Sequence, residues 1–199
     1  VPTGVFTEAT RNLQGRYAEW LDALVFGRNN IEDMTLTWRL GRHSVLYGES
    51  LFYGVNGIAA AQAPIDVIKL LSVPGTQFKE LMRPLNQISG QLQITQDLTF
   101  GAYYQLQWMK DRLPAAQSYF SSTDILDTGG ERFFTGPGMW LTRGDDTPAK
   151  NSGQGGAQLK YRSSALDAEF GLYAARYHSR SPRVLMSFQT GNYSLFYPE

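Results

Sequence analysis

The sequence has no cysteine among its 199 residues. That absence excludes disulfide frameworks, cysteine-ligated zinc sites and thiol catalysis. The chain also lacks any uninterrupted apolar run near the roughly 20 residues that a membrane-spanning helix needs. Lys plus Arg number 18, as do Asp plus Glu, so the formal net charge is zero. Broad, nonspecific electrostatic binding of nucleic acid is therefore excluded.

Charged residues are scarce and aromatic residues are frequent. Only 18% of residues are charged, 13% are aromatic and 20 are glycine. Ordinary soluble domains carry roughly 25% charged residues. This composition suits a β-protein, including one from a bacterial outer membrane.

Alternation of apolar and polar residues with a period of two is the strongest signal in the chain. Between Leu98 and Trp108, every second residue is apolar and the residues between them are small or polar. Residues 88–95 alternate in the same way, and Gln96-Asp97 separates the two runs. Two such runs joined by a minimal turn predict a β-hairpin.

Two further hairpins follow the same plan. One pairs residues 157–162 with a run from Leu166 to about His178, across a turn expected at 163–165. The other pairs a less regular run at 15–26 with 34–41, across a turn expected at 27–33. The sequence therefore predicts an all-β protein whose sheet is an antiparallel meander of about six strands.

The connections between the hairpins are much longer than the turns within them. Residues 48–86 and 110–155 form two long links, and a third long segment follows His178. Short turns then fall at one end of the sheet and long loops at the other, as in outer-membrane barrels. The predicted strands span about 8 to 13 residues, near the 9 to 11 of a tilted membrane strand.

The first long loop has helical character. Its segment 59–71 contains helix formers, with Pro64 near the first turn and Asp66 at the positive end of the helix dipole. We expect a short helical insertion in which Pro64, Asp66, Ile68 and Lys69 close or plug a barrel mouth. A helix packed on the outside of a soluble sheet is the alternative.

The two faces of the predicted strands differ in polarity. A wet lumen and a lipid-facing band would explain this difference, as would a half-buried soluble sheet. We predict that the lumen is lined by Arg39, Gln91, Gln93, Gln105, Gln107, Lys160, Arg162, Asp167 and Glu169. We predict that the lipid-facing residues include Leu98, Phe100, Leu106, Trp108 and Leu172.

Six strands are too few to close a membrane barrel. Every backbone polar group in hydrocarbon must be paired within the protein, and outer-membrane barrels begin at about 8 strands. We therefore expect residues 1–199 to be a piece of a larger transmembrane β-barrel, whose remaining part supplies the missing strands.

Several short motifs occur in a fixed order along the chain. They lie at 40–43, 47–50, 56–58, 63–66, 74–84, 104–108, 119–124, 177–182 and 197–199. The segments Leu40-Gly41-Arg42-His43 and Tyr47-Gly48-Glu49-Ser50 resemble an LGRQ…WGES signature, although His43 and Tyr47 depart from it. In this order the motifs resemble a bacterial outer-membrane family catalogued as domain of unknown function thirteen-hundred-and-two.

The resemblance implies a large single-chain β-barrel in the outer membrane of a Gram-negative bacterium. It implies handling of hydrophobic compounds such as lipids, in contact with outer-membrane lipid. It also implies a periplasmic partner and an RND-type exporter, and it supplies no catalytic residues.

The residues themselves offer little chemistry. Neither His43 nor His178 stands at metal-ligand spacing from a second ligand, no G-x-S-x-G elbow is present, and Gly153–Gly156 precedes a strand instead of a helix. The acidic residues of 110–155 match no calcium loop, so a solvated loop is the simpler interpretation. We expect no enzyme activity, no metal and no cofactor.

Three functions therefore remain. The first is a porin-like barrel segment that passes or exports small or hydrophobic compounds. The second is a soluble β-rich module that binds carbohydrate or lipid through aromatic platforms. The third is a structural or assembly protein. They differ in whether the apolar strand faces meet lipid, a protein core or further copies of the chain.

Overall fold

The computed structural model describes residues 5, 8–15, 18–48, 58–123 and 125–199. Its main feature is a six-stranded sheet in the order β1-β2-β3-β4-β7-β8, in which every neighbouring pair is antiparallel. The predicted all-β meander of six strands is confirmed. The strands are β1 (Ala23–Ile31), β2 (Met34–His43), β3 (Leu85–Gln93), β4 (Leu98–Gln105), β7 (Gln154–Ser163) and β8 (Ala168–Arg176).

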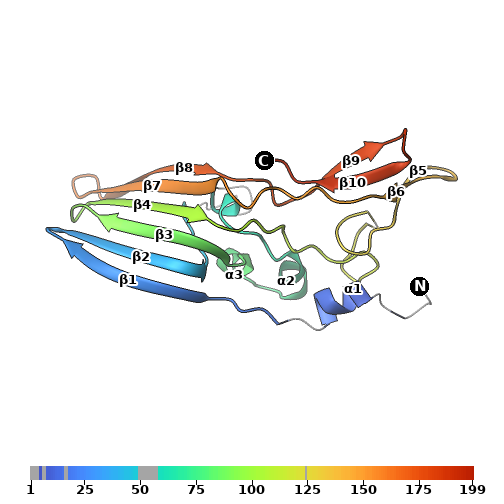
Figure 1. Ribbon diagram of the computed structural model, residues 1–199. Coiled ribbons are helices and arrows are strands. Elements are labelled where there is room, and N and C mark those ends of the chain that lie inside the picture. Colours follow the sequence, from blue (N-terminus) through green and yellow to red (C-terminus); the bar gives the residue numbers. More distant parts are fainter. Residues whose placement is uncertain (1–4, 6–7, 16–17, 49–57, 124) are drawn as a thin grey trace.

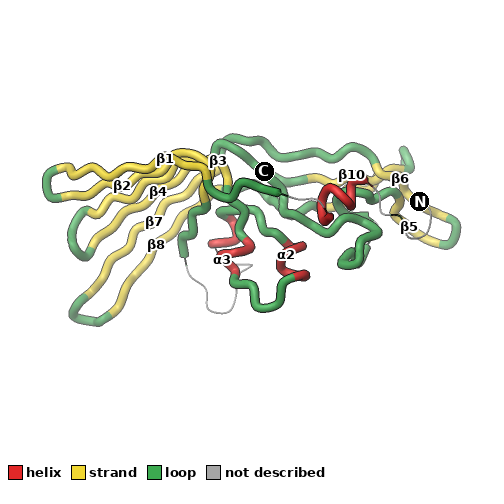
Figure 2. Tube along the Cα trace, turned by 90° about the horizontal axis from the view of Figure 1, so that it is seen from below, coloured by secondary structure: helices red, strands yellow, loops and turns green. Residues whose placement is uncertain are grey.

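The three hairpin turns lie together at one end of this sheet, on the left in Figures 1 and 2. Two turns differ from the prediction. β1 and β2 pair as far as Ile31 and Met34, so their turn is only Glu32-Asp33, with Glu32 at a φ of 53°. The turn between β7 and β8 occupies 164–167.

A second, four-stranded sheet lies at the other end of the molecule (Figure 1). It consists of β5 (Arg132–Gly136), β6 (Met139–Arg143), β10 (Asn192–Phe196) and β9 (Arg183–Ser187), in that order. β10 runs parallel to β6 and antiparallel to β9. The link 110–155, expected to be a loop, thus contains a hairpin, and the segment after His178 contains another.

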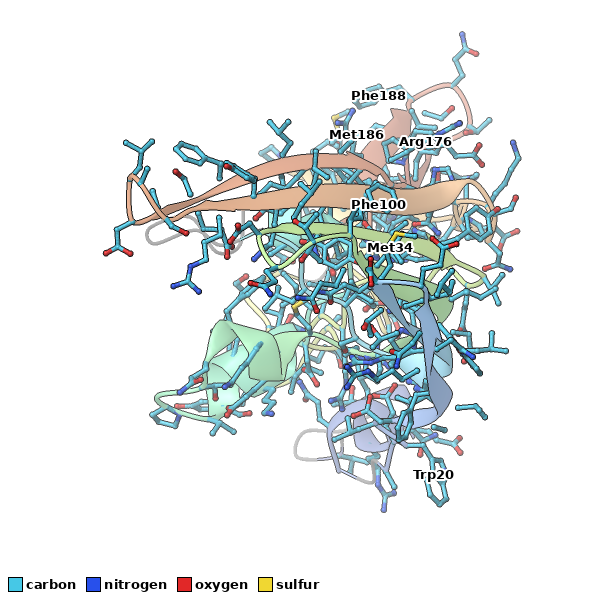
Figure 3. All side chains as sticks on the ribbon, turned by 90° about the vertical axis from the view of Figure 1, so that its left-hand side faces the viewer. Trp20, Met34, Phe100, Arg176, Met186 and Phe188 are labelled. Atoms are coloured by element: carbon cyan, nitrogen blue, oxygen red, sulfur yellow. The ribbon has the colours of Figure 1, made fainter. Side chains whose placement is uncertain are left out.

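The short helices of residues 58–82 lie on the concave side of the six-stranded sheet, as the end-on view in Figure 3 shows for the pale green coils. The expected helical insertion at 59–71 divides at Pro64 into a 3-10 turn, Ile58–Ala61, and α2 (Val67–Ser72). Then follows α3 (Phe78–Leu81), and near the N-terminus lie α1 (Glu8–Thr10) and a π-helical turn, Arg11–Gly15. No helix among the described residues is both long and apolar enough to cross a bilayer.

The buried apolar residues lie at two places. One group belongs to the helical insertion and its return into β3 and includes Ala63, Ile65, Leu81 and Leu85. The other lies where the end of the chain meets residues 108–149 and includes Ala149, Leu195 and Tyr197. The core is therefore under and beside the six-stranded sheet, and the long apolar rows of the strands contribute little to it.

Candidate functional site

The two faces of the six-stranded sheet have opposite character. Cross-strand pairing aligns Leu40 with Ile88 on one face, and Leu159 with both Phe100 and Leu172. We call this the outer apolar face. Its side chains remain exposed, from 37% for Leu159 to 71% for Leu172. A soluble sheet places such a row against its core, so the exposure of this row is unusual.

The opposite face, the inner polar face, is the one that the protein covers. Beside the buried Leu85 and Tyr103, this face buries an unusual number of polar side chains: Gln87, Ser89, Gln105, Gln154 and Gln158, each 8% exposed or less. Buried groups of this kind need hydrogen-bond partners. His43 of β2 bonds to Gln87 and Ser89, whereas Gln105 and Gln154 bond to segments outside the sheet. The arrangement reverses the usual apolar-in, polar-out pattern.

The structure distributes the predicted lipid-facing residues unevenly. Phe100 and Leu172 lie on the outer apolar face, as does the half-buried Leu98. Leu106 follows the end of β4 and is 49% exposed. The prediction for Trp108 is wrong, because the chain leaves the sheet at Gln105. Its indole Nε1 donates to Ser179 O at 3.2 Å, and its ring packs edge-on against Tyr197.

Most of the predicted lumen residues do share the inner polar face. The register places Arg39, Gln91, Gln93 and Gln105 there, together with Lys160, Arg162 and Glu169. Lys160 Nζ and Glu169 Oε1 form an ion pair at 2.9 Å.

Two of the predicted lumen residues lie elsewhere. Asp167 is in the turn before β8, at a φ of 46°. Gln107 lies beyond β4, and its Oε1 accepts a hydrogen bond from Asn86 at 3.1 Å, a residue of the outer side. The predicted strand began before the true start of β8 at Asp167 and continued past the true end of β4 at Gln107, so the alternation pattern assigned these two residues to the wrong place.

The predicted plug residues lie in a compact layer next to the inner polar face. Pro64, Asp66 and Ile68 are buried, whereas Lys69 is half-buried. Asp66 caps α2, because its Oδ1 accepts from the Lys69 amide at 2.9 Å. Its other oxygen pairs with Arg112 at 2.7 Å. The cap and the ion pair together fix the short helix to the segment at 111–112.

Arg180 joins this layer to the sheet. Its guanidinium donates to Ala61 O at 2.6 Å and to Gln105 Oε1 at 2.7 Å, and it is 5% exposed. A longer contact reaches Gln154 Oε1 at 3.5 Å. Burial lowers the pKa of Arg180 from its ordinary value, and the nearby Asp111 carboxylate opposes that shift. Sequence reasoning missed this residue, because it lies 75 positions from Gln105.

Gln62 makes a second connection. Its side chain donates to Tyr47 O and accepts from the Tyr47 amide, both at 2.6 Å, while its own carbonyl accepts from Gln105. The 3-10 turn is thus tied both to β4 and to the segment after β2. Polar side chains therefore join the helical insertion to the sheet, in addition to the buried apolar group that includes Leu85 of β3.

The two histidines serve structural roles. His43 Nδ1 contacts Gly41 O at 3.0 Å, and its Nε2 contacts Ser89 Oγ at 2.7 Å. His178 Nε2 contacts Ser152 O at 2.8 Å. Within the described residues no group of three potential metal ligands gathers.

A cavity of about 310 Å³ opens on the inner polar face between the strands and residues 44–47. Tyr47 stands at its side, in edge-on contact with Tyr103 at 5.5 Å between ring centres. Burial raises the pKa of the Tyr47 phenol, so its hydroxyl stays protonated. The cavity is lined by Thr37, Arg39, Ser44, Val45, Leu46, Tyr47, Ser89, Gly90, Gln91, Gln158 and Lys160.

Several positions that carried the sequence resemblance or a loop assignment, namely Glu49, Ser50, Asn56, Gly57 and Asp124, lie outside the described residues. No curated protein and no solved structure matches the chain. One family does match, over residues 2–199, and it is described as a protein of unknown function (DUF1302). Since this match covers nearly the whole chain, the protein belongs to the DUF1302 family, as its ordered motifs predicted.

Proposed function

We propose that this chain forms part of the wall and the inner plug of an outer-membrane β-barrel in a Gram-negative bacterium, and that the barrel lets small or hydrophobic, lipid-like compounds pass. The reversed polarity of the six-stranded sheet supports the proposal most strongly. Apolar side chains fill the uncovered face, while glutamines are buried on the covered one.

Energetics favour lipid as the partner of the outer apolar face. Removing apolar surface from water contributes roughly 25 cal/mol per Å². Val25, Leu40, Ile88, Phe100 and Leu172 would gain this free energy in hydrocarbon, whereas in water they form a contiguous exposed patch. The inner polar face keeps its hydrogen-bonding groups away from such a solvent, as a barrel interior does.

The sheet edges are consistent with a larger barrel. Among the described residues, β1 pairs only with β2, and β8 pairs only with β7. Bare edges are not tolerated in hydrocarbon, so the remaining part of the barrel would supply the strands that pair with them. The resemblance further suggests a periplasmic partner and an RND-type exporter as the proteins that work with this barrel.

Two adjacent substitutions in β4 test the proposal. Phe100→Arg places a charge on the outer apolar face, and Thr99→Arg, its matched control, places the same charge on the inner polar face. An outward Arg costs about 2 to 4 kcal/mol at the bilayer midplane and less near the interfaces. We expect Phe100→Arg, but not Thr99→Arg, to reduce the folded fraction recovered in outer membranes of the expressing bacterium.

Membrane fractionation and heat-modifiable electrophoretic mobility would measure that fraction. Recovery of the native full-length protein as a soluble monomer without detergent would contradict the proposal. It would favour the soluble binding module instead.

A further inference from the structure

The cavity on the inner polar face has a charge pattern that the overall composition conceals. The chain as a whole is neutral, yet the described residues that line the cavity include two cationic side chains, Arg39 and Lys160, and no carboxylate. Its other polar lining groups are hydroxyls and amides. Such a set offers hydrogen-bond donors under a positive potential.

The two cations differ in how they are held. Lys160 is oriented by Glu169 on the neighbouring strand, at 2.9 Å, and Glu169 does not line the cavity. Arg39 forms no ion pair with any residue that the structure describes. A guanidinium presents a planar fork of donors that suits carboxylate and phosphate oxygens. Arg39 is therefore the cation that an incoming anion would reach.

Gln158 provides a second, independent observation. It is only 6% exposed, it lines the cavity, and its Oε1 has no hydrogen-bond partner in the part of the chain that the structure describes. Buried polar atoms are almost always paired in native proteins, so an unpaired one at a cavity wall indicates a group that a ligand completes. The amide would accept from a protonated oxygen of the ligand, or after rotation donate to an anionic one.

A glycine of β4, Gly101, lies next to two of the lining side chains. A Cβ atom on Gly101 would lie 2.9 Å from both Gln158 Nε2 and Tyr47 Oη. The missing side chain lets these two polar groups lie directly against β4. Gly101 thus sets the position of Gln158 and Tyr47 at the cavity wall.

From these observations we propose that the cavity binds a small anionic group, a carboxylate or a phosphate, with Arg39 as its main contact and Lys160, Tyr47 and Gln158 as supporting contacts. The inference deepens the proposed passage function, on which it rests, by naming the chemistry of the solute. Rings of Arg and Lys select anions in other pores by the same electrostatics.

Binding can be measured without any transport assay. Purified full-length protein in neutral detergent would be titrated with inorganic phosphate, with acetate, and with dihexanoyl phosphatidate, by equilibrium dialysis and calorimetry. We expect saturable binding that Arg39→Gln weakens by about tenfold or more, as expected for a charged group that loses a bidentate partner. Arg162→Gln is the matched control, because Arg162 shares the inner polar face but does not line the cavity.

Gly101→Ala provides a test that leaves every charge in place. The added methyl group would displace Gln158 and Tyr47, so it should weaken binding as well. A phosphatidate affinity well above that of inorganic phosphate would identify a lipid headgroup as the source of the anion. Similar affinities would identify a free anion.

Absence of saturable binding by all three probes would overturn the inference. Equal losses in Arg39→Gln and Arg162→Gln would do the same, since they would show diffuse charge instead of a site. Neither result would affect the outer-membrane location, which the fractionation experiment decides separately.

Discussion

At the scale of single residues, the inner polar face depends on a few buried groups that each form hydrogen bonds with several partners. Arg180 is the clearest case, because one guanidinium serves the carbonyl of Ala61 and the side chain of Gln105. These acceptors are remote from water, so the cost of leaving them unpaired is higher than the net value of a typical hydrogen bond. The buried glutamines are therefore structural as well as polar.

Replacing Arg180 should loosen the plug from the sheet. Arg180→Ala leaves two buried acceptors without this donor, each costing about 1 to 3 kcal/mol, so we expect a loss of about 2 to 6 kcal/mol in the free energy of unfolding. Guanidinium unfolding of the purified protein in detergent would measure the change. The control is Arg183→Ala, since Arg183 is exposed on β9. If the two variants lost the same stability, the joining role of Arg180 would be wrong.

The limits of sequence reasoning are also visible at this scale. The period of two correctly separated Phe100 and Leu172 from Gln91 and Lys160, because side chains of a strand alternate by geometry. It failed at Trp108, which continues the pattern but leaves the sheet to contact Ser179 and Tyr197. Those partners lie 71 and 89 positions away along the chain, and no local sequence pattern indicates them.

At the scale of elements, α2 is held in place by its N-cap residue, Asp66. The Asp66 carboxylate accepts a hydrogen bond from the Lys69 amide and forms an ion pair with Arg112, which is 8% exposed. A helix of six residues is far too short to be stable alone. Its cap and its ion pair, rather than its intrinsic propensity, therefore keep α2 in place.

Two substitutions at Asp66 separate the cap from the ion pair. Asp66→Ala removes both the cap and the buried ion pair with Arg112, so we expect about 3 kcal/mol of destabilisation. Asp66→Asn keeps a good capping group and should lose less. Ser72→Ala, at the exposed end of α2, should change stability by about 0.5 kcal/mol or less. The readouts are unfolding in detergent and the rate of limited proteolysis within 58–82.

Equal destabilisation by Asp66→Ala and Asp66→Asn would show that the cap contributes nothing measurable. No effect of either substitution would show that the segment is held by other contacts.

The elements also show which parts of the fold are readable from sequence. Five of the six long strands were, because each carries several alternating pairs and has its neighbour in sequence as its partner or lies one long link away. β1 was readable only in part: its strand was expected at 15–26, whereas the structure has it at Ala23–Ile31, where apolar and polar residues do not alternate regularly. β5, β6, β9 and β10 were not. Each has five residues, and β10 pairs with β6 in parallel across some 50 positions. Aromatic residues in the second sheet, such as the labelled Phe188 in its turn (Figure 3), give no regular period.

At the scale of the whole molecule, the polarity of the two faces of the six-stranded sheet agrees with the arrangement of its turns and loops. All three turns of the six-stranded sheet lie at one end, and the helices and the second sheet lie at the other (Figure 2). The outer apolar face runs along every strand between these ends, and the cavity and the plug lie on the opposite side. Outer-membrane barrels are divided in the same way, with short turns at one rim and long loops at the other. The sequence predicted the division through loop lengths, but not the cavity, which depends on packing between distant segments.

The two edges of the six-stranded sheet distinguish a closed barrel from an open sheet. In the intact protein in detergent or lipid, we expect the amides of β1 and β8 that point away from β2 and β7 to exchange with solvent as slowly as those that point toward them. The reason is that a closed barrel pairs every strand on both sides. Residue-resolved hydrogen exchange measures this, with the outer edges of β5 and β9 as fast-exchanging references in the second sheet. Exchange of the outward amides of β1 and β8 as fast as those references would show an open sheet, and the proposed barrel would have to be abandoned.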